Sequence, residues 1–308
     1  MPQLTSTLLT PIHTNQLNPT YMMLPENLSL GSMRRDEVDI LAGWAADEGW
    51  NPGKADITIA WDVDREAFIA LRRGSDLVGS GTIFSYGGLF GFMGLFIVRR
   101  DLRGDGFGRQ LRRYLLESLQ ARLAPGASIG MDGVFAMAPF YERSGFVFAH
   151  EDVRFEGIAR GTMDAEVQQL DLSTFDIVDR FDRAHVPAPR TSFLQRWMFQ
   201  AGAYAVGLFE KDELAGYGIA RPARTGYKIG PLFAARPDIA ERLVMSLMAQ
   251  IAGEQVQLDV PEPNQAGIRL ALRLGFREVF GCARMYHGAV PNSPIGSIFG
   301  VTSFEFGQ

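Results

Sequence analysis

The stretch GLFIVRRDLRGDGFGR, from Gly94 to Arg109, decides the fold of this chain. Its apolar start, Leu95 to Val98, is rich in strand-forming residues and predicts a short buried strand. A basic loop with glycines at positions 104, 106 and 108 follows it. Leucines then recur every four residues, at 111, 115, 119 and 123, which predicts an amphipathic helix that ends at Pro125-Gly126.

A glycine-rich loop between a strand and the N-terminus of a helix predicts an anion-binding cradle. The glycines let the backbone approach a ligand, its N–H groups point at the ligand, and the helix dipole favours negative charge. The arginines of the loop add charge-assisted hydrogen bonds that suit a diphosphate. The alternative interpretation is an ordinary glycine turn. The loop matches neither the Gly-Lys-Ser/Thr ending of a P-loop nor the Gly-x-Gly-x-x-Gly pattern.

The composition predicts a globular protein of two domains. The chain has 308 residues, of which 46% are hydrophobic, so it can bury large cores. Its net charge of −5 argues mildly against a nucleic-acid partner and is compatible with a cationic substrate. Cys282 is the only cysteine, so an intrachain disulfide is impossible and a reducing, cytoplasmic setting fits.

Membrane and metal partners are not expected. No apolar run approaches the roughly 18 residues of a membrane helix. The first 27 residues show no signal-peptide pattern, and we interpret residues 1–27 as an N-terminal arm. The histidines have no close metal-ligand spacing, so we expect no metal site; they are His13, His150, His185 and His287.

Periodicity places the remaining elements of the first half. We expect a strand over 28–33 and an amphipathic helix over 36–47 that ends in a turn with Glu48, Trp50 and Asn51. Further elements are expected as a helix over 55–61, strands over 67–71, 77–84 and 128–134, a short helix over 137–143 and a strand over 146–155. Trp50, among turn formers, is a candidate for lining a pocket, with core packing as the alternative.

The second half of the sequence repeats the first. Leu77 to Gly81 matches Leu214 to Gly218, and Leu95-Phe96 matches Leu232-Phe233 at the same offset of 137 positions. Gly145-Phe146 matches Gly275-Phe276 at an offset of 130, so the second copy has lost seven residues in the interval of the glycine loop. The boundary between the copies is predicted near 157–161, and residues 291–308 form a C-terminal strand or tail.

The spacing Arg103-x-x-Gly106-x-Gly108 and the order of elements resemble the GCN5-related N-acetyltransferases (GNAT). The resemblance covers roughly residues 28–157, with a degenerate copy over 158–290. It implies an α/β (α+β) fold of two tandem GNAT-like domains, each with a mixed, mostly antiparallel twisted sheet flanked by helices. It also implies acetyl-coenzyme A as the cofactor.

The family often ends with an Asn, a Tyr seven positions later and then Gly-Phe. The first copy has Tyr141 and Gly145-Phe146, but Val134 stands in the Asn position. The second copy has Asn264 and Gly275-Phe276, but Ala271 stands in the Tyr position. The tyrosine and the glycine loop therefore belong to the first copy only, and the chain resembles tandem acetyltransferases whose C-terminal half belongs to a divergent acetyltransferase-like family.

The mechanism that the resemblance implies is direct attack of a neutral amine on the thioester. Backbone N–H groups near Phe96 would polarise the carbonyl oxygen. Tyr141 would protonate the leaving thiolate, because a phenol of pKa about 10 stays protonated beside a thiol of about 8.5. Packing is the alternative role for this ring. The expected coenzyme-binding residues are Phe96, Ile97, Val98, Arg103, Gly104, Asp105, Gly106, Phe107, Gly108 and Arg109.

The general base is not fixed by the sequence. The central strand, Phe90 to Val98, contains no acidic residue. Glu48 in the turn or Asp132 on the next strand could relay the proton through water, and both could instead be solvated or capping groups. Trp50 and Asn51 are candidates for binding the acceptor.

The favoured function is an N-acetyltransferase that acts on a small-molecule amine. An acyltransferase with another acyl group or acceptor is the first alternative, and a noncatalytic coenzyme A sensor is the second. Tyr141 argues against the sensor. Oligomerisation is possible. We also expect the second copy to pack against the first and to wall the acceptor pocket.

Overall fold

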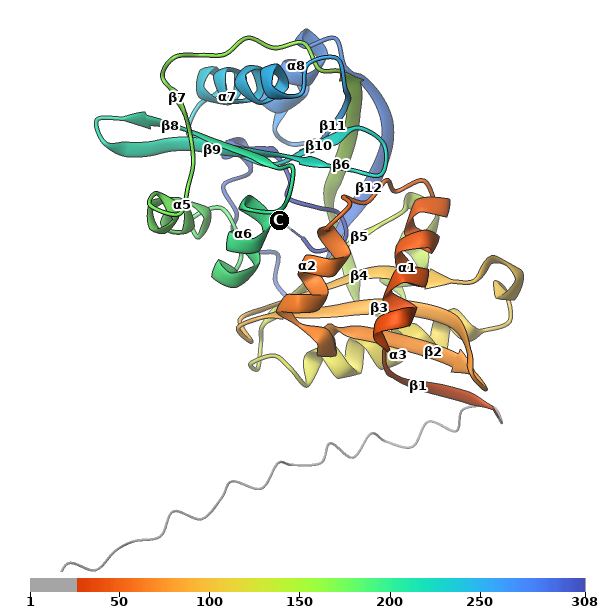
Figure 1. The fold of residues 1–308 in the computed structure, drawn as a ribbon. Coiled ribbons are helices and arrows are strands. Elements are labelled where there is room, and N and C mark those ends of the chain that lie inside the picture. The colour runs from red at the N-terminus through yellow and green to blue at the C-terminus, as the bar shows by residue number, and fades with distance from the viewer. Residues whose placement is uncertain (1–26, 308) are drawn as a thin grey trace, which may run out of the picture.

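The computed structural model describes residues 27–307, which form one sheet of thirteen strands with helices on its faces (Figure 1). The arm expected over residues 1–27 lies outside the described residues except for its last position. The first half of the chain contributes β1 (Leu28–Ser32), α1 (Arg35–Asp47), α2 (Asp56–Val63), η1 (Arg65–Ala67), β2 (Phe68–Arg73), β3 (Asp76–Tyr86), β4 (Phe90–Val98), η2 (Arg100–Leu102), α3 (Phe107–Gln120), β5 (Ser128–Gly133), η3 (Phe135–Met137), α4 (Ala138–Glu142) and β6 (Phe146–Ile158).

The second half repeats the order of the strands and α-helices of the first, from β1 onward. Its elements are β7 (Val167–Gln169), α5 (Phe175–Asp182), α6 (Thr191–Met198), β8 (Tyr204–Glu210), β9 (Glu213–Pro222), β10 (Tyr227–Ala234), α7 (Pro237–Gln250), β11 (Gln255–Pro261), α8 (Gln265–Arg273), β12 (Arg277–His287), η4 (Ile295–Ser297) and β13 (Ile298–Gly300). The matched sequence segments fall on β3 and β9 and on β4 and β10. The predicted internal repeat is therefore confirmed.

The sheet is mostly antiparallel, as predicted. Among the described strands, only the pairs β4–β5 and β10–β11 are parallel. Each parallel pair is connected through a helix, α3 in the first half and α7 in the second. This is the connection that parallel neighbours require, because a short hairpin cannot return the chain in the same direction.

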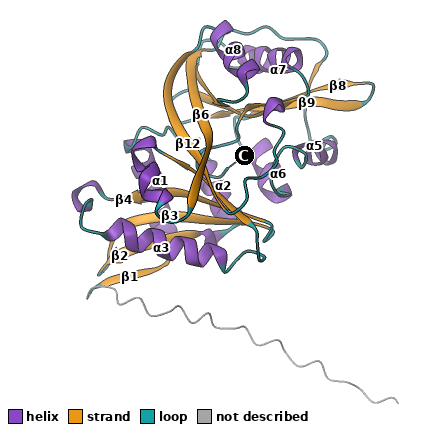
Figure 2. Cartoon of the chain, turned by 180° about the vertical axis from the view of Figure 1, so that it is seen from behind, coloured by secondary structure: helices purple, strands orange, loops and turns teal. Residues whose placement is uncertain are grey.

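The two halves exchange their last strands. β12 of the second half lies between β5 and β6 of the first half and is antiparallel to both. β6 in turn pairs with β11 of the second half, from Asp152 to Ile158. The two long strands therefore join the halves, as both views show (Figures 1 and 2). The boundary near 157–161 stays a prediction, and the sheet is continuous between the halves through the pairing of β6 with β11.

The leucine face of α3 covers one face of the first half of the sheet. Leu111, Leu115 and Leu119 are fully buried in a cluster with apolar side chains of β3, β4 and β5. Gly81 on β3 allows this approach, because a Cβ there would lie 2.4 Å from a methyl carbon of Leu115. The predicted amphipathic helix is thus confirmed for Leu111, Leu115 and Leu119, but it ends at Gln120, before Leu123 and the predicted end at Pro125-Gly126.

The other face of the sheet carries a core that both halves share. Phe84 of β3 and Trp197 of α6 belong to one buried cluster, together with Phe306 near the C-terminus. Phe84 and Phe306 make an edge-to-face contact with 5.2 Å between ring centroids. Helices α2 and α6 also touch each other, so the halves share an apolar interior as well as a sheet. Among residues 27–307, we find no helix that is long and apolar enough to span a membrane.

A buried ion cluster holds β12 in the sheet. Arg284 of β12 donates to the carboxylate of Asp132 on β5 over 2.5 and 2.8 Å. The same guanidinium lies 3.2 Å from the carboxylate of Asp152 on β6. All three side chains are at most 2% exposed. Removing the cation would leave two buried carboxylates without it, which costs more than the pair itself contributes.

We therefore predict that Arg284→Met lowers the free energy of unfolding by about 3–5 kcal/mol, the usual cost of breaking a buried ion pair from one side. Urea unfolding of the full chain measures this change. Arg277→Met is the matched control, because Arg277 lies on the same strand with its side chain 80% exposed. Its loss should stay within about 1 kcal/mol. Equal losses in the two variants would show that the cluster does not hold β12.

Candidate active site

The site begins where β4 and β5 part. The two strands pair in parallel from Phe90 with Ser128 to Met93 with Met131, and the pairing ends there. Leu95, two residues further along β4, has a φ of +47°, and the register against β3 shifts at the same place. A side chain at positive φ is strained, and such outliers often lie at functional sites. The bulge separates β4 from β5 and opens the sheet at its centre.

A cavity of about 530 Å³ lies at this opening. Residues of both halves of the chain line it. The first half contributes β4, β5, α4 and the loops after α1 and β4, and the second half contributes β12 and the C-terminal tail. The lining residues are Glu48, Trp50, Met93, Gly94, Leu95, Phe96, Ile97, Val98, Leu102, Arg103, Gly104, Gly106, Gly108, Arg109, Met131, Asp132, Gly133, Val134, Met137, Phe140, Tyr141, Phe280, Cys282, Phe304 and Glu305.

The glycine loop forms one end of the cavity. Gly104 and Gly106 have φ values of +99° and +87°, and Gly106 is the residue that precedes the first turn of α3. The backbone N–H groups of residues 104–108 have no hydrogen-bond acceptor among residues 27–307. Unpaired amides at a helix N-terminus, with arginines beside them, are the donors that a phosphate group requires. The geometry of the predicted cradle is therefore present.

Tyr141 enters the cavity from α4. Its ring packs edge-to-face on Phe96 of β4 with 6.0 Å between centroids, and it is only 4% exposed. Gly133 makes room for the ring, because a Cβ there would lie 2.9 Å from it. Burial raises the pKa of Tyr141 well above that of a free phenol, and the charge of Arg112 lowers it only in part. The hydroxyl is protonated at neutral pH and can donate.

Glu48 lies at the edge of the cavity and binds the loop. Its Oε1 accepts hydrogen bonds from Arg100 at 3.1 Å and from Arg103 at 2.7 Å. Burial raises the pKa of Glu48, but these hydrogen bonds and charges outweigh burial, and the pKa is below its usual value. A carboxylate held in this way is a weak base. Its observed contacts orient the loop arginines.

Asp132 is in the opposite electrostatic situation. It is the first residue of β5 beyond the last pair with β4, and its side chain is fully buried. Burial raises its pKa, Arg284 lowers it, and the neighbouring carboxyl of Asp152 raises it again, so that the pKa is about 7. Two carboxylates that share one guanidinium titrate as a coupled pair. A group of this kind can exchange a proton near neutral pH.

Most of the predicted site residues meet in this cavity, but three do not line it. Asp105 is exposed, and Phe107 packs against the α3 cluster. Asn51 lies in the contact between the halves, where its amide donates to the side chain of Gln257 and its oxygen accepts from the backbone N–H of Thr225. Through these contacts the side chain of Asn51 binds the second half of the chain. Among residues 27–307, no group of three or more His, Cys, Asp or Glu side chains is arranged to hold a metal ion.

Four lining residues come from parts of the sequence that show no motif: Phe280 and Cys282 on β12, and Phe304 and Glu305 in the tail. Phe304 lies over the guanidinium of Arg154, with 4.8 Å between the carbon of that group and the ring centroid. No spacing in the sequence identifies these positions, because Phe280 and Cys282 reach the cavity through strand exchange and Phe304 and Glu305 through the path of the tail. The expectation that the second copy walls part of the pocket is supported by Phe280 and Cys282.

The second half lacks an equivalent cradle. Helix α7 begins three residues after the end of β10, whereas α3 begins nine residues after the end of β4. Pro237, the first residue of α7, has no N–H to offer. Arg236 beside it is paired with Glu210 and Asp238.

Protein-family models match both halves of the chain. One acetyltransferase (GNAT) domain model matches residues 58–167, and a second acetyltransferase (GNAT) domain model matches residues 178–300. The chain therefore belongs to the GNAT superfamily, as a tandem protein with two GNAT domains, and it is an acyltransferase.

One curated relative and two solved structures extend this finding. Holothin acyltransferase of Pseudoalteromonas sp. (strain SANK 73390) is 28% identical over 275 residues, which cover 88% of this chain and 92% of the relative. The crystal structure of a proposed acetyltransferase from Pyrococcus horikoshii has a TM-score of 0.80 at 20% identity and covers 96% of this chain and 100% of that one. A tandem GNAT protein from the clavulanic acid biosynthesis pathway has a TM-score of 0.60 at 15% identity, covering 86% of this chain and 99% of its own. At these identities the two structures support the fold.

We predict that Gly106→Val abolishes binding of acetyl-coenzyme A, because the side chain fills the cradle and a positive φ strains it. Gly126→Val is the matched control: Gly126 also has a positive φ, of +84°, with open space around it after α3. Isothermal titration should give one coenzyme A per wild-type chain and unchanged affinity in the control. Unchanged affinity in Gly106→Val, or a stoichiometry of two, would contradict this assignment of the site.

Proposed function

We propose that this chain transfers an acetyl group from acetyl-coenzyme A to a small-molecule amine. The observation that carries the proposal is the coincidence of two features in one cavity. The unpaired amides of residues 104–108 lie at one end, and the protonated Tyr141 lies beside the β4 bulge. A diphosphate on the loop and a thioester along β4 would place the sulfur near a proton donor.

In the proposed reaction the amine nitrogen attacks the thioester carbonyl carbon and the carbon–sulfur bond breaks. Backbone N–H groups near Phe96 would stabilise the developing oxyanion. Tyr141 gives its proton to the departing thiolate, which leaves as the free thiol of coenzyme A. The proton lost by the amine passes through water to Asp132. Asp132 then releases a proton to solvent and Tyr141 takes one up, so that both residues return to their starting protonation states.

The choice of Asp132 over Glu48 follows from their surroundings. Glu48 is held anionic by two arginines and has a lowered pKa. Asp132 has a pKa of about 7 and lies at the point where β4 and β5 separate. The most effective general base has a pKa near the working pH.

A second candidate is transfer of another acyl group or use of a different acceptor, such as holothin. The observation in its favour is the likeness to holothin acyltransferase over 88% of this chain. Release of free thiol from a series of coenzyme A thioesters, with holothin and simple amines as acceptors, separates the two candidates. The preferred pair is the one with the highest kcat/KM. Absence of thiol release with every pair would reject both.

Tyr141→Phe is predicted to lower turnover about 10²–10⁴-fold, the usual contribution of a general acid, while the affinity for acetyl-coenzyme A stays unchanged. Single-turnover measurements of thiol release isolate the chemical step. Tyr114→Phe on α3, where the ring packs beside the same apolar cluster, is the control and should keep full activity. If Tyr141→Phe also keeps its rate, the ring has only a packing role.

The pH profile should distinguish the two candidate bases. In the wild type, kcat should fall about tenfold per pH unit below pH 7, because Asp132 becomes protonated there. Asp132→Asn should lose this dependence and turn over about 10²–10⁴-fold more slowly. Glu48→Gln should keep it. Ionisation of the acceptor amine appears equally in all three proteins, so the comparison isolates the residue. A profile that is altered by Glu48→Gln and not by Asp132→Asn would reverse the assignment.

A further inference from the structure

The C-terminal tail, residues 301–307, passes through the interior beside the cavity. Every residue of this segment is buried. The backbone N–H of Val301 donates to Asp259 of the second half at 2.8 Å, and the hydroxyl of Tyr86 donates to the carbonyl of Phe306 at 2.5 Å. The tail is therefore fixed to both halves.

The tail crosses β4 next to the bulge. A Cβ on Gly94 would lie 1.9 Å from the carbonyl oxygen of Glu305, so only glycine lets the two backbones approach this closely. Gly94 directly precedes Leu95, the residue with positive φ. This contact places Glu305 beside the part of β4 along which the thioester is proposed to lie.

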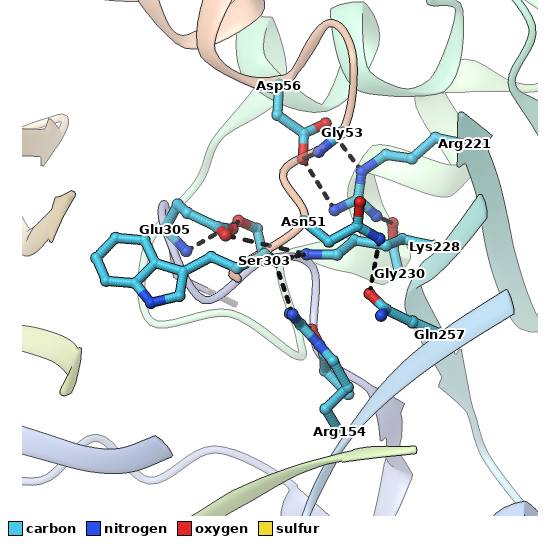
Figure 3. A network of polar contacts seen from close by, with 12 residues as sticks. Asn51, Gly53, Asp56, Arg154, Arg221, Lys228, Gly230, Gln257, Ser303 and Glu305 are labelled. Atoms are coloured by element: carbon cyan, nitrogen blue, oxygen red, sulfur yellow. Dashed lines mark hydrogen bonds and ion pairs between the residues drawn. The ribbon is translucent and has the colours of Figure 1, made fainter. Parts of the chain in front are cut away.

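The carboxylate of Glu305 is only partly satisfied. The side chain is 3% exposed, and its Oε2 accepts a hydrogen bond from the hydroxyl of Ser303. Its Oε1 receives no hydrogen bond from any residue between 27 and 307. The nearest cation, the Nζ of Lys228, lies 3.9 Å away and donates instead to the carbonyl of Trp50. Figure 3 shows Glu305 with Ser303 and Lys228 in this network.

Arg154, a second cation of the network, already has its own hydrogen-bond acceptors. Arg154 donates to both oxygens of Asp259, at 2.6 and 2.7 Å, and to the carbonyl of Trp50 at 2.7 Å. Burial raises the pKa of Glu305, but the charges of Lys228 and Arg154 and the hydrogen bond from Ser303 outweigh burial, and the pKa is lowered. Glu305 is therefore anionic at neutral pH and is unsuited to act as the base.

A buried anionic oxygen without a donor is costly unless a ligand supplies one. Three aromatic residues, Trp50, Phe280 and Phe304, line the same cavity as Glu305, and the ring centroids of Phe280 and Phe304 lie 6.3 Å apart. We propose that Glu305 binds the amino group of the acceptor, and that the acceptor is a small amine on a flat, apolar body that packs against these three rings. This inference rests on the proposed function and names its substrate class.

The assignment is consistent with the direction of transfer. An amino group that donates one N–H to Oε1 keeps its lone pair free for the thioester carbon. Because Glu305 stays anionic, the proton released on attack goes to Asp132 and not to the residue that holds the amine. The two carboxylates thus have separate roles because their environments move their pKa values in opposite directions.

The test compares ligands that differ only in the donor group. Saturation-transfer NMR with the coenzyme A-loaded full chain measures binding of tryptamine and of 3-propylindole, which has a methyl group in place of the amine and so has no donor there. We expect tryptamine to bind the wild type and to bind about 10–100-fold more weakly to Glu305→Gln, the range for a lost hydrogen bond to a charged group. The affinity for 3-propylindole should change much less. Glu278→Gln, the same change at an exposed position of β12, is the control.

Glu305→Asp is the control that separates loss of binding from a folding defect. It keeps the charge beside Lys228 but withdraws the carboxylate by one methylene group, so thermal unfolding should stay close to that of the wild type while tryptamine binding falls. Equal binding of tryptamine by the wild type and both variants would overturn the inference, and so would absence of tryptamine binding to the wild type. Glu305-dependent binding without any thiol release would instead reject the proposed reaction, whereas thiol release that is insensitive to Glu305 would reject only this site.

Discussion

The insertion of β12 between β5 and β6 is the constraint on which the rest of this structure depends. Arg284 makes it possible, because a single buried guanidinium serves carboxylates on both neighbouring strands, Asp132 and Asp152. The same insertion brings Phe280 and Cys282 into the wall of the cavity. It also places Asp132 in the crowded charge environment that raises its pKa to about 7. The stability of the fold, the shape of the cavity and the proposed proton transfer therefore all depend on the cluster of Arg284, Asp132 and Asp152.

The two ends of the cavity are lined by different kinds of chemical group. The loop end offers unpaired amides and the arginines at 103 and 109, which suit phosphate groups. The other end offers aromatic rings and the buried carboxylate of Glu305. Between them lies the part of β4 around Leu95, which has a positive φ and does not pair with β5. One strained residue thus connects two chemically different binding surfaces.

The second GNAT domain has the fold of the first without its glycine loop or its tyrosine. Its sheet and helix α7 are fully packed, with Ile239, Leu243 and Leu247 completely buried. The short connection from β10 to α7 and Ala271 in α8 leave neither a cradle nor a tyrosine. What this domain contributes is a strand for the neighbouring sheet and a wall for its cavity, which are roles that require packing and not catalytic groups.

The sequence by itself determined the fold class, the internal repeat and the glycine loop of residues 104–108. Each depends on a local pattern: the apolar run at Leu95 to Val98, the leucine period of α3, and the glycine spacing from 104 to 108. The tertiary structure alone decided that β12 crosses into the other half, that Glu305 lies beside Gly94, and that Asn51 contacts Gln257 outside the cavity. These contacts join residues up to about two hundred positions apart, and no local periodicity encodes them, because they form only when the two halves share a sheet and distant segments pack against each other.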